Sequence, residues 1–107
     1  MDDGFVKVAR LPEIPEGRSR RVLVGTTEIA LWRVNGRIYA INNVCAHQHI
    51  AALHQGTLEG TTIRCPMHGW TYALETGVAV YGSGRVRTYR VRVEGEDVFV
   101  EEPVSEW

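Results

Sequence analysis

The chain has 107 residues, enough for one domain with a modest core and too few for two. Its 12 basic and 13 acidic residues leave a formal net charge of −1, which gives no reason to expect binding to nucleic acid or to an anionic membrane. No apolar run is long enough to span a membrane, and the N-terminal MDDGFVKVAR lacks the pattern of a signal peptide, so we expect a cytoplasmic protein.

The dominant hydrophobic period along the chain is two residues, which is typical of strands. The two prolines of LPEIPEG (11–17) predict a loop, and Asn35-Gly36 predicts a tight type I′ hairpin turn, because both central residues of that turn need a positive φ. In chain order we expect strands at 5–10, 20–25, 28–34 and 34–41, and a second hairpin around Gly95 within 88–102. Several short strands separated by turn signals predict an all-β fold, an antiparallel sandwich or barrel.

The segment from 42 to 84 differs from the rest of the chain. It holds both cysteines, all four histidines and short strand-like pieces such as TLEG, TTIRC and WTYALE. An irregular connection of this length is uncommon in a compact domain unless it is functional. We therefore expect a small subdomain, approximately 42–84, inserted into a single domain that spans 1–107.

The cysteines and histidines of this segment form a spaced pattern, Cys45-x-His47, then 17 residues, then Cys65-x-x-His68. Thiolate and imidazole ligands together suit zinc or iron. Structural zinc sites usually pair cysteine with cysteine and histidine with histidine, whereas each loop here contributes one of each. That arrangement suits a two-iron cluster with both cysteines on one iron and both histidines on the other, and a single zinc ion is the alternative.

The stretches CAHQH (45–49) and CPMHGWTY (65–72) resemble the cluster-binding motif of Rieske [2Fe–2S] proteins, C-x-H followed by C-x-x-H-G. The chain is most similar, over nearly its whole length, to the small Rieske ferredoxins of bacterial aromatic-ring dioxygenase systems. The resemblance implies the Rieske fold with its inserted cluster-binding subdomain. It also implies one [2Fe–2S] cluster, with Cys45 and Cys65 on the inner iron and His47 and His68 on the outer iron.

The same resemblance implies a function. The protein would be a soluble one-electron carrier, not an enzyme, which receives electrons from a ferredoxin reductase and passes them to a terminal oxygenase. Docking would be transient and would use the cluster tip. Two other interpretations stay open: the small Rieske subunit of an assimilatory nitrite reductase, and a zinc-stabilised binding module.

Five further residues of the motif region are expected to shape or tune the site: Gln48, Pro66, Gly69, Trp70 and Tyr72. Gln48 stands where the ferredoxins often have glycine, in a first loop one residue longer than usual. Pro66 fixes φ after a ligand, and Gly69 is expected to let backbone approach the cluster. Trp70 is expected either to pack beneath the loop or to lie exposed near the cluster as a docking residue. The third loop, YGSGRV (81–86), carries glycines where the family commonly carries proline.

Two thiolate and two imidazole ligands leave an oxidised [2Fe–2S] centre neutral, so its potential lies between roughly −150 and +300 mV, above the roughly −400 mV of plant-type ferredoxins. High-potential Rieske proteins carry an extra disulfide between the loops, but this chain has Ile50 and Met67 at those positions. They also carry a serine where this chain has Trp70 and a tyrosine that is matched by Tyr72. We therefore predict a potential below about 0 mV. His49 does not match the motif, and His54 is expected to be an exposed loop residue.

Overall fold

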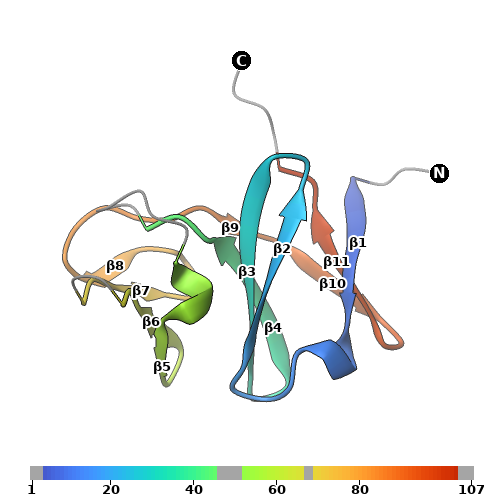
Figure 1. The fold of residues 1–107 in the computed structure, drawn as a ribbon, viewed down its shortest axis with the longest axis horizontal. Helices are drawn as coiled ribbons and strands as arrows, with labels where there is room; N and C mark the ends of the chain where they lie inside the picture. The colour runs from blue at the N-terminus through green and yellow to red at the C-terminus, as the bar shows by residue number, and fades with distance from the viewer. Residues whose placement is uncertain (1–3, 46–51, 67–68, 104–107) are drawn as a thin grey trace.

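A computed structural model describes residues 4–45, 52–66 and 69–103. The described chain folds into three antiparallel sheets, which confirms the predicted all-β class (Figure 1). The first sheet has the order β1 (Phe5–Arg10), β11 (Asp97–Glu101), β10 (Val91–Glu94). The second has the order β2 (Ser19–Val24), β3 (Thr27–Val34), β4 (Arg37–Asn42), β9 (Thr88–Tyr89). The third has the order β5 (Thr57–Glu59), β6 (Thr62–Arg64), β7 (Thr71–Ala73), β8 (Ala79–Tyr81).

Two single-turn 3₁₀ helices complete the secondary structure, η1 (Leu11–Glu13) and η2 (Leu53–Gln55). The first lies within the segment 11–17, where the prolines predicted only a loop. Within the described ranges, the structure contains no helix that could span a membrane.

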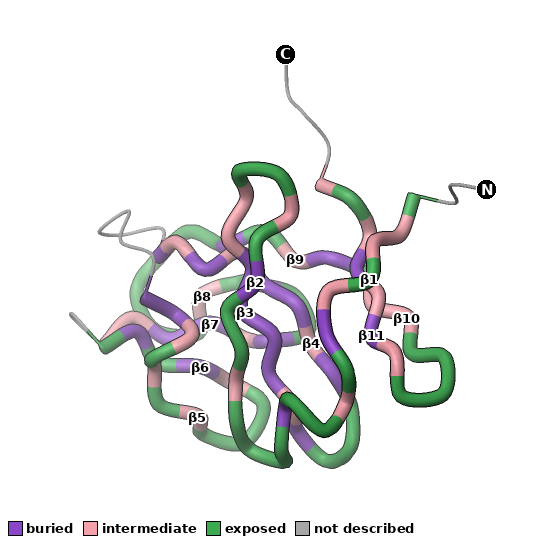
Figure 2. The backbone as a smooth tube through the Cα atoms, turned by 45° about the vertical axis from the view of Figure 1, so that its right-hand side comes forward, coloured by how far each residue is buried: buried purple, intermediate pink, exposed green. Residues whose placement is uncertain are grey.

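The second sheet is buried on both faces, and β3 shows why. Its side chains alternate between two cores: Ile29 and Leu31 pack with the first sheet, while Ala30 and Trp32 pack with the third. Figure 2 shows buried residues along β3 and β4, between the other two sheets. A strand covered on both faces has no polar side, which accounts for the nearly continuous apolar run of EIALWRV.

The third sheet lies entirely within the predicted insert, to one side of the other two sheets (Figure 1). The insert leaves from the end of β4 and returns to β9, which pairs with β4 through Ala40↔Tyr89 and Ile41↔Thr88. An isolated bridge between Val78 and Arg85 closes its last part. Its two ends are therefore neighbours, as an insertion into a β frame requires, although β8 was not foreseen as a strand. The boundaries 42–84 stay a prediction.

The turn between β3 and β4 has the predicted type I′ geometry, with φ of 54° at Asn35 and 78° at Gly36. The carboxylate of Glu16 accepts the N–H groups of both residues, at 2.8 Å from Gly36. These two hydrogen bonds, that from Gly36 first, lower the pKa of Glu16 below its usual 4.5. Glu16 therefore fastens the segment before β2 to the hairpin turn.

This contact predicts a pH-dependent contribution to stability. A carboxyl whose folded pKa is depressed stabilises the fold above the unfolded pKa, and the contribution is lost as the pH falls through the folded value. We expect Glu16→Gln to lower the free energy of unfolding at neutral pH, and the deficit relative to the parent chain to shrink towards about pH 3. Urea denaturation at both pH values measures this. Glu75→Gln, at an exposed turn position, is the control; an equal deficit for Glu16→Gln at both pH values would contradict the prediction.

Candidate metal centre

The two cysteines follow two different strands and are buried in the same core. Cys45 lies three residues beyond the end of β4, and Cys65 directly follows β6. Each is 1% exposed and each belongs to the apolar cluster between the second and third sheets. Both are thiols rather than halves of a disulfide.

Tyr72 brings a hydroxyl to this buried pair. It lies on β7 opposite Ile63 of β6, is fully buried, and its hydroxyl oxygen is 3.4 Å from the Cys45 Sγ. Tyr72 is therefore a core residue whose polar end lies within hydrogen-bonding distance of the Cys45 sulfur, which the sequence predicts to be a ligand.

The first loop is closed at its base by hydrogen bonds to two consecutive asparagines. The Asn42 Oδ1 accepts the N–H of Val44 at 2.9 Å, which turns the chain towards Cys45. The backbone oxygen of Asn43 accepts the N–H groups of Ala52 and Leu53, at 3.0 and 3.1 Å. The chain therefore returns, after the loop, to the residue from which it left.

The second loop is shorter, and backbone hydrogen bonds join its two ends. The Cys65 N–H donates to the Trp70 oxygen at 2.7 Å, and the Gly69 N–H donates to the Cys65 oxygen at 3.2 Å. Gly69 has a φ of 77°, a conformation that glycine adopts without strain, and Pro66 is exposed. Cys65 thus lies where β6 ends and the loop begins, and both its N–H and its backbone oxygen are hydrogen-bonded within the loop.

Trp70 packs beneath the third loop, which agrees with one of the two placements that the sequence left open. It is partly buried against the core that contains both cysteines, and its ring lies under Gly82. A Cβ added to Gly82 would come within 2.4 Å of the Trp70 Cδ2 atom, and Gly82 has a φ of 98°. The third loop carries glycines where the family commonly carries proline. One of them, Gly82, lets the backbone lie directly on the Trp70 indole ring.

Three predicted site residues, His47, Gln48 and His68, lie outside the described residues, as does His49. In the remainder of the chain, no three histidine, cysteine, aspartate or glutamate side chains come together as a metal site. The predicted roles of Gln48, Pro66 and Gly69 towards a cluster therefore stay predictions.

The expectation for His54 was wrong. Its side chain is half-buried rather than exposed, and its Nδ1 lies 2.9 Å from the Nδ2 of the fully buried Asn43. Partial burial lowers the pKa of His54 below its usual 6.5, the charge of Arg21 lowers it further, and Glu28 opposes both. Nothing in the sequence singled out Asn43, because an asparagine before a loop usually reads as a local turn residue.

The chemistry of the described donors fits a metal–sulfur centre. Two thiolates buried in an apolar cluster are costly unless a metal ion compensates their charge. Cys45 and Cys65 belong to one buried core cluster, so both sulfur atoms would be available to a centre at its edge. A soft ion, iron or zinc, suits such sulfur ligands.

Comparison with known proteins places the chain among iron–sulfur proteins. The model of the Rieske [2Fe-2S] domain matches residues 4–100. The ferredoxin component of the naphthalene 1,2-dioxygenase system of Pseudomonas aeruginosa is 37% identical over 103 residues, which cover 94% of this chain and 98% of that protein.

Solved structures agree with this match. The ferredoxin of carbazole 1,9a-dioxygenase from Nocardioides aromaticivorans IC177 has a TM-score of 0.89 at 28% identity, covering 94% of this chain and 100% of its own. A structure described as the complex of reduced oxygenase and oxidized ferredoxin in carbazole 1,9a-dioxygenase contains a chain with a TM-score of 0.85 at 29% identity. That alignment covers 97% of this chain and 100% of the other.

The hydroxyl of Tyr72 predicts an effect on the reduction potential. A hydrogen bond to a ligand sulfur stabilises the more negative, reduced state, so Tyr72→Phe should lower the potential by roughly tens of millivolts. A redox titration followed by absorbance measures the change. Tyr39→Phe, which removes the hydroxyl of a partly buried tyrosine packed against the same core, is the control and should leave the potential unchanged. An unchanged potential in Tyr72→Phe would mean that its hydroxyl does not tune the centre.

The contact between Gly82 and Trp70 predicts an unequal cost for two glycine substitutions. Gly95→Ala places a Cβ in open space at a φ of 64°, and should cost about 1–2 kcal/mol from backbone strain alone. Gly82→Ala adds displacement of the indole and should cost about 1–3 kcal/mol more. Thermal unfolding of both variants tests this, and equal losses would show that the indole does not constrain the third loop.

Proposed function

The chain belongs to the Rieske [2Fe-2S] domain family, and on that premise we propose that it carries single electrons from a ferredoxin reductase to the terminal oxygenase of an aromatic-ring dioxygenase system. The observation that carries the proposal is the pair of buried thiols, Cys45 and Cys65, in a chain that is 37% identical to a dioxygenase ferredoxin component. The cofactor is a Rieske-type [2Fe–2S] cluster, and the protein is an electron-transfer component rather than a catalyst.

We assign four ligands, Cys45 and Cys65 to the inner iron and His47 and His68 to the outer iron. When bound, the cluster accepts and releases one electron at a time. The residues around it hold the sulfur atoms in the apolar core, exclude water from them, and offer the Tyr72 hydroxyl to the Cys45 sulfur. Under these conditions the protein, rather than the solvent, determines the free energy of a change in charge at the sulfur atoms.

The partners would dock at the cluster tip, formed by the two ligand loops and the third loop. Three observations on the described side of this tip support an interface: Trp70 is only partly buried, and Val80 and Tyr81 are exposed by 62% and 66%. Exposed aromatic and aliphatic residues beside a redox centre suit a small, transient contact. The solved complex of a ferredoxin with an oxygenase supports the oxygenase as one partner, and the reductase is the electron source that any such carrier requires.

Two alternatives lose support. A single zinc ion would suit the two thiols, but the family match favours the two-iron cluster. The small subunit of a nitrite reductase would share the fold, but the 37% identical relative belongs to a dioxygenase system. A cytoplasmic location is also part of this proposal, and the two reduced thiols are consistent with a reducing compartment.

The test is metal and acid-labile sulfide analysis of the purified chain, with an EPR spectrum after reduction by dithionite. We expect two iron and two sulfide per chain, and a rhombic signal whose average g lies below that of four-cysteine clusters. Cys45→Ser should abolish the signal, whereas Thr26→Ala, in the exposed turn between β2 and β3, keeps every assigned ligand and should retain it. A colourless, EPR-silent protein with one zinc ion would refute the carrier function.

A further inference from the structure

Asn43 is an unusual residue for a loop. Among the buried residues that the structure describes, Asn43 is the only one with a side-chain amide, and it is 0% exposed. A buried amide must satisfy both its donor and its acceptor inside the protein. The partners of Asn43 therefore show what it is placed to hold.

Its backbone N–H donates to the Glu28 oxygen of β3 at 2.9 Å, and most of its other hydrogen bonds join it to the end of the first loop. Its backbone oxygen accepts the N–H groups of Ala52 and Leu53, and its Oδ1 accepts the N–H of His54 at 2.6 Å. Its Nδ2 lies 2.9 Å from the His54 Nδ1 and 3.4 Å from a Glu28 carboxylate oxygen. Asn43, which precedes the loop, therefore accepts hydrogen bonds from three consecutive residues that follow it, 52–54.

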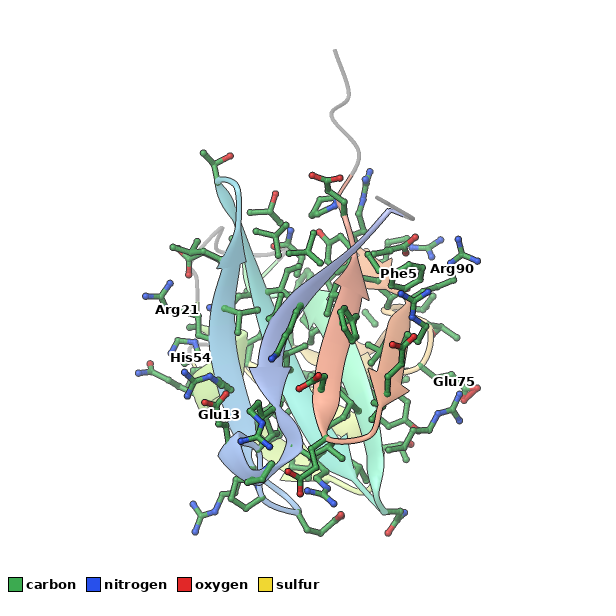
Figure 3. All side chains as sticks on the ribbon, turned by 90° about the vertical axis from the view of Figure 1, so that its right-hand side faces the viewer. Phe5, Glu13, Arg21, His54, Glu75 and Arg90 are labelled. Carbon is green, nitrogen blue, oxygen red and sulfur yellow. The ribbon has the colours of Figure 1, made fainter. Side chains whose placement is uncertain are left out.

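The other side of His54 is attached to the β frame. Its backbone oxygen accepts a hydrogen bond from the Ser19 hydroxyl of β2. The charged groups around it are Arg21 of β2, Glu28 of β3, which itself pairs with Arg21 at 3.3 Å, and Arg18, which lines the same surface hollow. Figure 3 shows His54 and Arg21 on the same side of the molecule, next to β2.

We propose that Asn43 and His54 form a clamp that ties Asn43 to residues 52–54 and so positions Cys45 at the start of the first cluster loop, and that the clamp is closed only while His54 is neutral. The proposal rests on the proposed function, because the loop matters as the carrier of Cys45 and His47. Both members are positioning residues, since neither is among the assigned ligands.

The hydrogen bonds favour one protonation state of the closed clamp. The Asn43 Oδ1 accepts the backbone N–H of His54 at 2.6 Å and lies 3.2 Å from the His54 Nδ1, whereas the Asn43 Nδ2 lies closer to that Nδ1, at 2.9 Å. The shorter contact favours donation from Nδ2 to an Nδ1 that carries no proton. Protonation of the His54 Nδ1 would place two donors, this atom and the Asn43 Nδ2, 2.9 Å apart. It would also add a positive charge next to Arg21, and the carboxylate of Glu28 is already paired with Arg21. The lowered pKa of His54 agrees with this preference for the neutral form.

Opening the clamp would reach the cluster through a short path. Cys45 is two residues beyond Asn43, and its Sγ is the atom 3.4 Å from the Tyr72 hydroxyl. Release of these contacts would leave Cys45 less well held, so the cluster should be lost faster. Residues that orient metal ligands from outside typically change metal retention by 10–100-fold when removed.

The experiment measures the rate at which the visible absorbance of the holoprotein is lost to an excess of an iron chelator, at pH 7.5 and pH 5.5. Asn43→Ala should lose its cluster at least about tenfold faster than the parent chain at pH 7.5. His54→Asn keeps an acceptor near the Nδ1 position but does not titrate, so its rate at pH 7.5 should match the parent. Between the two pH values, the parent should accelerate more than His54→Asn.

Val98→Ala is the matched control, because it removes core packing in the β frame away from the loop. It should lower the melting temperature and leave the EPR g values and the ratio of the two rates unchanged. Asn43→Ala should shift the g values. If Asn43→Ala matches Val98→Ala in g values and in rate at an equal loss of melting temperature, the positioning role is overturned. If His54→Asn shows the same pH ratio as the parent, the dependence on neutral His54 is overturned.

A failure of the proposed function would be distinguishable from a failure of the clamp. A chain purified without iron refutes the carrier function. In either form of the chain, ¹⁵N NMR of the imidazole should show an unprotonated Nδ1 for His54 at pH 7.5, and a protonated Nδ1 at that pH would overturn the clamp.

Discussion

The return of a long insert to its point of departure is the constraint on which the rest of this structure depends. The insert begins at the end of β4, and Asn42 fixes its far end, because the Asn42 N–H donates to the Arg87 oxygen and its side-chain Nδ2 donates to the Tyr89 hydroxyl. Asn43, the next residue, fixes the end of the first loop within the insert. Two consecutive asparagines, through backbone and side-chain groups, therefore supply the contacts that offset the entropy of closing two loops of different length.

The closed insert packs on one face of the second sheet, and the cysteines of the cluster site are buried in the core that forms between them. The second sheet has one face for the first sheet and one for the insert, so the insert gains an apolar partner without a large core of its own. Cys45 and Cys65 occupy the interior of that shared core. Their position suits a cluster that also contributes to folding, because metal–ligand bonds link segments that packing alone would leave weakly joined.

The parts of the fold that were predictable are those set by local geometry. Asn35-Gly36 requires a positive φ at both residues, so the hairpin could be placed within a residue or two. The family was equally predictable, because the spacing of the cysteines and histidines departs from the usual zinc arrangement and matches the Rieske motif. The four ligand positions themselves stay a prediction. The strand β8, by contrast, has little signal of its own, since its edge position leaves Val80 and Tyr81 exposed.

The residues that were missed act over long distances in the sequence. His54 is separated from Asn43 by 11 positions and from Ser19 by 35, and no period or motif connects them. Likewise, Gly82 became informative only when Trp70 was seen beneath it. Hydrogen bonds and ring contacts of this kind depend on how the insert meets the frame, which single-sequence patterns do not encode.

A one-electron carrier needs both kinds of feature for different reasons. The ligand pattern decides which cofactor is held, and so sets the broad range of the potential. The contacts from outside the ligand set, such as the Tyr72 hydroxyl and the Asn43 amide, decide how firmly the sulfurs are held and how their charge is compensated. Because partners meet this protein only briefly, its site has to keep its geometry unaided between encounters. The side chains that close its loops are therefore as much part of the functional site as the ligands themselves.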